Sequence, residues 1–201
     1  MNEPLLIATT NAGKLREIRG ILAAVPVALL SLDQFPDIAE PEETGLTFAE
    51  NARLKARYYS ARTGLVAVAD DSGLQIDALG GAPGVHSARW HGSDYPTKFA
   101  AIYRELAARG LATSAAKFVA QIAVARDGEV LFEASGVVEG EIAPAPKGAH
   151  GFGYDPIFYY PPYQSTLAEV EGTRKAAVSH RGQAFRQLAD WMSTFTAARS
   201  I

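Results

Sequence analysis

The sequence Leu65-Val-Ala-Val-Ala-Asp-Asp-Ser-Gly73 decides the fold class of this 201-residue chain. It opens with an apolar run typical of a buried strand, which predicts a strand over 65–69 that ends where Asp70 begins the Asp-Asp-Ser-Gly segment. Open α/β sheets bind ligands at the carboxyl ends of their strands, so carboxylates here are candidates for metal binding. Because successive strand residues point to opposite faces, only one of Asp70 and Asp71 is expected to face a site. The alternative is an acidic turn in which Gly73 has a positive φ.

Helical and extended patterns alternate along the rest of the chain. Short apolar runs predict further strands, at 5–9, 27–32 and 74–78. Apolar residues at helical spacing, with capping signals, predict helices at about 11–25, 47–63, 96–109 and from 179 onward. A period-two pattern on both sides of Asp127-Gly128 predicts a hairpin, which excludes a purely parallel sheet. The fold class is therefore α/β with a mixed β-sheet, and residues 1–201 are expected to form a single, bilobed domain.

Composition limits the class of protein. Hydrophobic residues make up 48% of the chain and charged residues 20%, which excludes wholesale disorder. The net charge of −3 argues against nucleic-acid binding by bulk electrostatics. The lack of cysteine excludes a disulfide scaffold, a thiolate nucleophile and cysteine-based metal sites. Neither a signal peptide nor an apolar run long enough to span a bilayer occurs, so a cytoplasmic protein without membrane contact is expected.

The segment Thr9-Thr-Asn-Ala-Gly-Lys14 lies where a predicted strand passes into a predicted helix. Unpaired N–H groups and the dipole at a helix start favour a phosphate, and Lys14 adds a positive charge. The segment is not a Walker loop, because the first glycine and the Ser or Thr after the lysine are missing. The alternative is that Asn11 is a plain N-cap beside a solvated lysine.

Three further segments carry chemistry-bearing residues. The acidic loop at Glu42-Glu43 precedes a helix on which Asn51 and Lys55 share a face, although such loops are usually solvated. Gly151-Phe-Gly-Tyr-Asp-Pro156 offers aromatic faces that could stack on a nucleobase, or it is a structural aromatic turn. Lys175 and Ser179-His-Arg181 could donate to a carbonyl on a base edge, or they are surface residues near a helix cap.

Taken together, these segments resemble the inosine/xanthosine triphosphate pyrophosphatase family, hydrolases that remove deaminated purine nucleotides. The matching segments follow the family's order and are Ala8-Thr-Thr-Asn-Ala-Gly-Lys14, Glu42-Glu-Thr-Gly-Leu-Thr-Phe48, Glu50-Asn-Ala-Arg-Leu-Lys-Ala56, Ala69-Asp-Asp-Ser-Gly73, Leu79-Gly-Gly-Ala-Pro-Gly84, Ser87-Ala-Arg89, Gly151-Phe-Gly-Tyr-Asp-Pro156 and Ser179-His-Arg-Gly-Gln183. One departure is Thr10, where bacterial relatives usually carry glycine and where a Cβ limits the backbone dihedrals.

The resemblance implies a homodimer with an elongated mixed sheet flanked by helices, and two lobes with a cleft between them. It implies Mg²⁺-dependent hydrolysis of ITP, dITP and XTP between the α- and β-phosphates, giving a monophosphate and pyrophosphate. The residues that it assigns to the phosphates are Thr9, Thr10, Asn11, Ala12, Gly13, Lys14, Lys55 and Ser72. Those that it assigns to the base and sugar are Phe152, Gly153, Tyr154, Asp155, Lys175, His180 and Arg181.

The resemblance also assigns Glu42 and Asp71 to the metal, with Asp71 as the proton acceptor. The motif leaves open whether Glu42 or Glu43 meets the metal, and whether Asp71 binds the metal or takes the proton directly. Two other functions are considered. The first is a catalytically silent purine nucleotide sensor, which would not need Asp71, Glu42 and Lys14 together. The second is a pyrophosphatase for modified pyrimidine triphosphates, which the Ser179-His-Arg181 segment disfavours.

Overall fold

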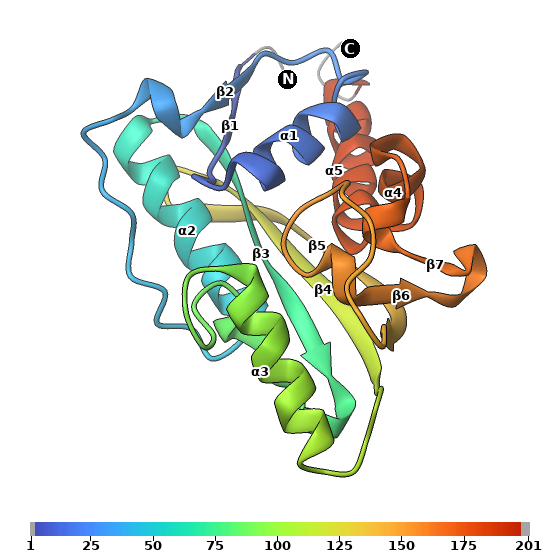
Figure 1. The fold of residues 1–201 in the computed structure, drawn as a ribbon. Helices are drawn as coiled ribbons and strands as arrows, with labels where there is room; N and C mark the ends of the chain where they lie inside the picture. Colours follow the sequence, from blue (N-terminus) through green and yellow to red (C-terminus); the bar gives the residue numbers. More distant parts are fainter. Residues whose placement is uncertain (1–2, 198–201) are drawn as a thin grey trace. The chain divides into compact units, whose positions relative to one another are not determined.

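The computed structural model describes residues 3–197 (Figure 1), and α-helices alternate with strands as far as residue 126. The strands of this part of the chain are β1 (Leu5–Ile7), β2 (Leu29–Ser31), β3 (Val66–Ile76), β4 (Ala115–Arg126), β5 (Glu129–Ile142), β6 (Phe158–Tyr160) and β7 (Ser165–Thr166). Its α-helices are α1 (Ala12–Ile21), α2 (Phe48–Thr63), α3 (Tyr95–Ala107), α4 (Gly172–Val178) and α5 (His180–Ala197). None of these helices is both long enough and apolar enough to cross a membrane.

The strands form a mixed sheet in the order β2-β1-β3-β4-β5-β6-β7. β1 pairs in parallel with both β2 and β3, whereas β6 pairs antiparallel with β5 and β7. β4 and β5 are joined by Asp127 and Gly128, which both have positive φ (51° and 79°), as a two-residue hairpin turn requires. The predicted α/β class with a mixed sheet is confirmed.

β3 differs from the prediction. The sequence predicts a strand that ends at Asp70 and a second strand at 74–78, but Val66–Ile76 is one continuous strand. Gly73 is not among the residues with positive φ, so the alternative of an acidic turn is also wrong. The strand continues through Asp70 and Asp71 because each buried carboxylate meets a basic side chain, which offsets the loss of hydration.

The chain is made of two compact units. Unit 1 comprises residues 1–71, 120–136 and 181–201, and unit 2 comprises residues 72–119 and 137–180. In unit 1 the side chains of β1 and β3 alternate between two hydrophobic clusters. Ile7 and Val68 pack with Ile18 of α1 and Phe185 of α5, whereas their neighbours along each strand pack with Ala56 and other residues of α2. Helices therefore cover both faces of the strands of unit 1.

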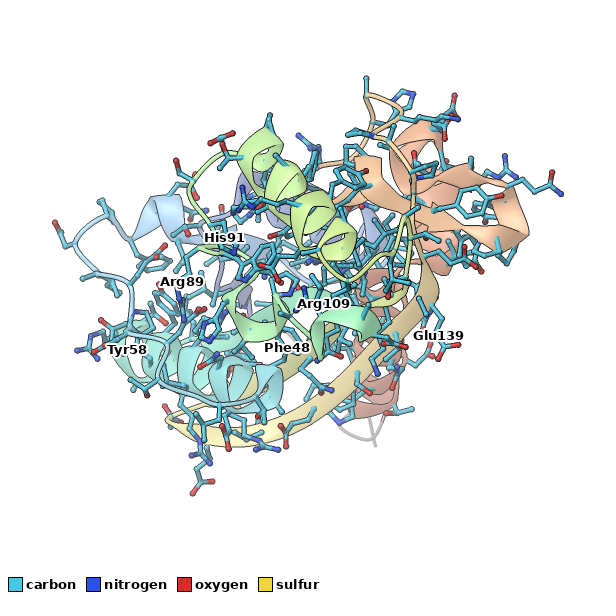
Figure 2. The ribbon with its side chains drawn as sticks, turned by 60° about the horizontal axis from the view of Figure 1, so that its bottom comes forward. Phe48, Tyr58, Arg89, His91, Arg109 and Glu139 are labelled. Atoms are coloured by element: carbon cyan, nitrogen blue, oxygen red, sulfur yellow. The ribbon has the colours of Figure 1, made fainter. Side chains whose placement is uncertain are left out.

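Unit 2 has a hydrophobic core of its own. Leu74 and Ile76 of β3 pack with Phe99 and Ile102 of α3 and with Phe158 of β6. The loop that leads into α3 carries Arg89 and His91, both labelled in Figure 2. α4 is missing from the prediction, because it is only seven residues long and begins at a glycine.

α2 begins and ends as the sequence predicts. The Thr47 hydroxyl accepts a hydrogen bond from the Glu50 amide, and the Glu50 carboxylate accepts one from the Thr47 amide, so the capping box is complete. Gly64 ends the helix in the left-handed conformation. This helix carries Asn51 and Lys55, so the cap also fixes part of the candidate site.

Replacing Thr47 by alanine is expected to lower the free energy of unfolding by about 1 kcal/mol, because the amides of the first turn lose an acceptor. Urea unfolding measures the loss. Thr173→Ala, at an exposed position on α4, is the matched control and is expected to change stability by less than about 0.5 kcal/mol. Equal losses in the two variants would contradict the capping role.

Candidate functional site

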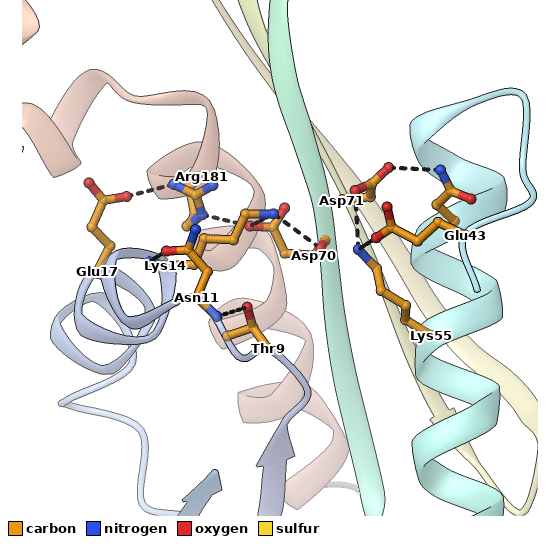
Figure 3. Close-up of polar contacts among 10 residues, drawn as sticks. Thr9, Asn11, Lys14, Glu17, Glu43, Lys55, Asp70, Asp71 and Arg181 are labelled. Atoms are coloured by element: carbon orange, nitrogen blue, oxygen red, sulfur yellow. Dashed lines mark hydrogen bonds and ion pairs between the residues drawn. The ribbon is translucent and has the colours of Figure 1, made fainter. Parts of the chain in front are cut away.

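Asp70 and Asp71 of β3 direct their carboxylates to different partners. Asp70 binds basic residues of α1 and α5, whereas Asp71 binds residues of α2 (Figure 3). The predicted alternation of the two side chains is confirmed. All of these residues belong to unit 1, and each carboxylate has its own hydrogen-bond and ion-pair partners.

The Asp70 carboxylate lies between two cations. Its Oδ2 accepts a hydrogen bond of 2.6 Å from Nε of Arg181 and lies 3.6 Å from Nζ of Lys14. Burial opposes ionisation of Asp70, but Arg181 and Lys14 outweigh it and hold the pKa of this carboxyl well below its usual range. Nη1 of Arg181 also donates to Glu17, at 2.7 Å. Arg181 is only 2% exposed, so it is a buried member of an ion-pair network.

The turn before α1 carries the predicted phosphate-binding segment. Asn11 is the N-cap, with its Oδ1 accepting from the Lys14 amide at 3.0 Å, and the Asn11 amide donates to the Thr9 hydroxyl at 3.2 Å. Thr10 is not in the left-handed region, so the side chain in place of the family's glycine imposes no backbone strain. Burial lowers the pKa of Lys14 below its ordinary value despite the nearby Asp70, so a second anion would stabilise its charged form. Asn11 is therefore an N-cap, but the alternative of a solvated lysine is wrong, because Lys14 is largely buried beside Asp70.

On the other face of β3, Lys55 joins two carboxylates. Its Nζ lies 2.7 Å from Oε1 of Glu43 and 3.1 Å from Oδ1 of Asp71. Asn51 donates to the other Asp71 oxygen at 3.2 Å, and also accepts from the Gly45 amide, which ties the acidic loop to α2. Burial is the largest single influence on the pKa of both Asp71 and Lys55. It raises the pKa of Asp71 above the ordinary value, despite the nearby Lys55. For Lys55, burial acts to lower the pKa, but Asp71 and Glu43 together outweigh it, so the pKa is raised.

These contacts bear on the predicted metal site. One ammonium group touches oxygens of both Asp71 and Glu43, so two carboxylates already converge on a single cation. Mg²⁺ in nucleotide sites is held by one or two carboxylates together with substrate phosphates, so this donor set suits it. No cluster of three or more acidic or histidine side chains occurs in the part of the chain that the structure describes. Glu42 is exposed, whereas Glu43 is half-buried beside Lys55.

The predicted base-binding residues of unit 2 form a second polar cluster. Lys175 makes a buried ion pair with Asp155, and its ammonium lies 5.0 Å from the centre of the Phe152 ring. Asp155 also accepts from the Phe152 amide at 2.8 Å, which fixes the loop that includes Gly153 and Tyr154. His180 is buried, with its ring stacked on Phe118 at 4.8 Å. The structure therefore brings the aromatic loop, Lys175 and Asp155 together.

The structure adds residues that the sequence analysis did not assign. Glu17, Asp70 and Asn51 are direct partners of predicted site residues. Asn51 could be found from its spacing of four residues to Lys55, which places both on one helical face. Glu17 lies three residues after Lys14 and shares its helix face, but its partner Arg181 is 164 residues away. Such a long-range ion pair leaves no signal in a single sequence.

The chain matches the Ham1 family over residues 5–191. It belongs to that family. A relative from Gloeobacter violaceus, named dITP/XTP pyrophosphatase, is 49% identical over 185 residues, covering 92% of this chain and 91% of the relative. A relative of the same name from Nostoc sp. is 47% identical and covers 94% of this chain and 93% of its own length. The structure of a HAM1 protein from Coxiella burnetii has a TM-score of 0.87 and 41% identity, covering 96% of this chain and all of that one. The predicted family resemblance is confirmed.

Replacing Arg181 by alanine is expected to destabilise this family member by about 3–5 kcal/mol, because it leaves the buried charge of Asp70 with a weaker counterion. Asp70→Asn and the double variant complete a double-mutant cycle, measured by urea unfolding. The double variant is expected to lose less stability than the two single variants added together. Additive losses would mean that the two side chains do not stabilise each other.

Proposed function

We propose that this chain is a Mg²⁺-dependent nucleoside triphosphate pyrophosphatase that hydrolyses ITP, dITP and XTP to the monophosphate and pyrophosphate. The proposal is carried by the two sets of lysine and carboxylate contacts on the two faces of β3. They offer the positive charge and the proton acceptor that attack by water on phosphorus requires. Relatives that are 44–49% identical and named dITP/XTP pyrophosphatase support the substrate class.

In this proposal the N-terminal end of α1 and two lysines hold the triphosphate. Backbone N–H groups at the start of α1 and the Lys14 ammonium bind phosphate oxygens, with Thr9, Thr10, Asn11, Ala12 and Gly13 shaping the turn. Lys55 and the Ser72 hydroxyl provide further contacts to the phosphates. Charge-assisted hydrogen bonds of this kind are shorter and stronger than neutral ones, and they hold the phosphorus in line for attack.

Asp71 has the central role. Burial raises the pKa of its carboxyl above the ordinary value, which makes the carboxylate a better proton acceptor near neutral pH. Asn51 and Lys55 hold its two oxygens in a fixed orientation. A bound Mg²⁺ would neutralise charge on the phosphates and acidify a coordinated water. Asp71 and an acidic-loop glutamate would hold it, and the contact between Glu43 and Lys55 favours Glu43 over Glu42 for this role.

The groups proposed to recognise the base come from the aromatic loop and from the segment between Lys175 and Arg181. Phe152 supplies an aromatic face, and Lys175, His180 and Arg181 are the candidate donors to the carbonyl at position 6 of hypoxanthine or xanthine. Adenine has an amino group there, so the same donors would be left unpaired. We further propose that the protein acts as a homodimer in the cytoplasm on free nucleotides, without a nucleic-acid partner, in keeping with its net negative charge.

Pyrophosphate release from a panel of nucleoside triphosphates, with and without Mg²⁺, tests the proposed function. ITP, dITP and XTP are expected to be hydrolysed only with the metal, and kcat/KM for ATP is expected to be lower by roughly 10⁴. Binding of ITP without pyrophosphate release would indicate a nucleotide sensor. Preference for modified pyrimidine triphosphates would replace the proposed substrate class.

Asp71→Asn is expected to lower kcat for ITP by about 10²–10⁴, since the amide keeps the shape of the carboxylate but accepts no proton. Asp77→Asn, at an exposed position just after β3, is the matched control and should retain wild-type kinetics. Activity of Asp71→Asn within a few-fold of the wild type would remove Asp71 from the reaction.

A further inference from the structure

Unit 2 contains a buried lysine that has no part in the function proposed above. Lys98 of α3 is 1% exposed, and it makes no ion pair with any residue between 3 and 197. Its Nζ donates to the carbonyl oxygens of Ala88 at 2.5 Å and Ser87 at 3.3 Å, and it lies 4.6 Å from the centre of the Tyr95 ring. The carbonyls and the ring face are the groups that hold the ammonium in place.

Such a position is unfavourable for a charged group. Burial lowers the pKa of Lys98, and Asp94 at the start of the same helix only partly offsets this. Two carbonyls stabilise an ammonium less well than a carboxylate would, so a specific local interaction must favour lysine at this buried position. The reason lies in Ser87, which is the C-cap residue of the 3₁₀ helix Gly84–His86. Carbonyl groups at such an end lack donors within the helix, and Lys98 supplies them.

Ser87 in turn holds two segments that the proposed function uses. Its Oγ accepts a hydrogen bond of 3.0 Å from the Leu74 amide, next to Ser72 and Gly73 on β3, and donates to Gly84 O at 2.6 Å. Its carbonyl oxygen accepts a second hydrogen bond, of 2.9 Å, from the Tyr154 hydroxyl. One residue therefore contacts both β3 just beyond Asp71 and the aromatic loop.

The packing at Gly73 makes this contact rigid. A Cβ at that position would overlap Ser87 Oγ and would lie 2.6 Å from Gly84 O. The β3 backbone thus lies directly against Ser87 with no space between them. A displacement of Ser87 would be passed to Ser72 on one side and to Tyr154 on the other.

We propose that Lys98 is a positioning residue for substrate binding, which acts by holding Ser87 and, through it, the Ser72–Leu74 backbone and the Tyr154 loop. The inference rests on the proposed function, because Ser72 and Tyr154 are assigned there to substrate. Lys98 itself does not touch the substrate. Its loss would weaken binding of the nucleotide more than it slows the chemical step.

The test compares Lys98→Met with Arg104→Met, which removes an exposed cation from the same helix. Lys98→Met is expected to raise KM for ITP roughly tenfold, because Ser72 and Tyr154 are held less firmly, with kcat changed less than about threefold. Arg104→Met is expected to retain wild-type constants. Ser87→Ala, which removes the hydroxyl and leaves Lys98 in place, is expected to raise KM in the same way and serves if Lys98→Met does not fold.

Amide hydrogen exchange gives a readout that does not require activity. The Leu74 amide is expected to exchange at least about tenfold faster in Lys98→Met than in the wild type, with the amides of the unit 1 core unchanged. Lower stability with unchanged KM, or unchanged exchange at Leu74, would reduce Lys98 to a packing residue and overturn the inference. If the wild type releases no pyrophosphate from any nucleotide, the proposed function fails, whereas the exchange at Leu74 still decides whether Lys98 positions β3.

Discussion

The two-residue period of β3 is the constraint on which the candidate site depends. Even-numbered residues from Val66 to Asp70 point toward α1 and α5, and odd-numbered residues from Ala67 to Asp71 point toward α2. Each face of the strand therefore changes from apolar to acidic at the same point along its length, at Asp70 on one face and at Asp71 on the other. The helices that cover the two faces change with it, from apolar contacts to Lys14 and Arg181 on one side and Lys55 on the other. A shift of one residue in the register of β3 would exchange the partners of both aspartates.

The two aspartates illustrate different uses of buried charge. Asp70 lies between Lys14 and Arg181, which outweigh the effect of burial and hold the pKa of its carboxyl well below the usual range. Asp71 has a single lysine partner and a raised pKa, so its carboxylate is more basic and better suited to accept a proton. Two identical side chains, adjacent in the chain, acquire different chemistry because burial outweighs Lys55 at Asp71, whereas two cations outweigh burial at Asp70.

Sequence patterns predicted what is determined locally. The limits of α2 followed from its capping box and Gly64, and the hairpin followed from Asp127-Gly128, because caps and turns depend on neighbours in the chain. The continuity of β3 was not predicted, since Asp-Asp-Ser-Gly has turn composition, and the charges that stabilise it as a strand come from three other elements. The Arg181–Asp70 pair, separated by 111 residues, and the contact of Lys98 with Ser87 depend on packing that no local pattern encodes. Family motifs indicated the residues of the candidate site, but not which of them bind one another.

Gly73 shows how packing can couple two positions during evolution. This glycine does not have a positive φ, and the atoms nearest to a Cβ at this position belong to the Ser87 side chain and to the Gly84 carbonyl. A smaller residue at position 87 would relieve the contact with the Ser87 side chain, but the Gly84 carbonyl oxygen would still lie 2.6 Å from a Cβ at position 73. The Asp-Asp-Ser-Gly and Ser-Ala-Arg motifs are separate in the sequence, yet Gly73 and Ser87 are in direct contact, so the residue at one position restricts the residue at the other. A library that randomises position 73 would therefore retain mainly glycine even when position 87 is varied with it, because the carbonyl of a third residue, Gly84, fills the same space.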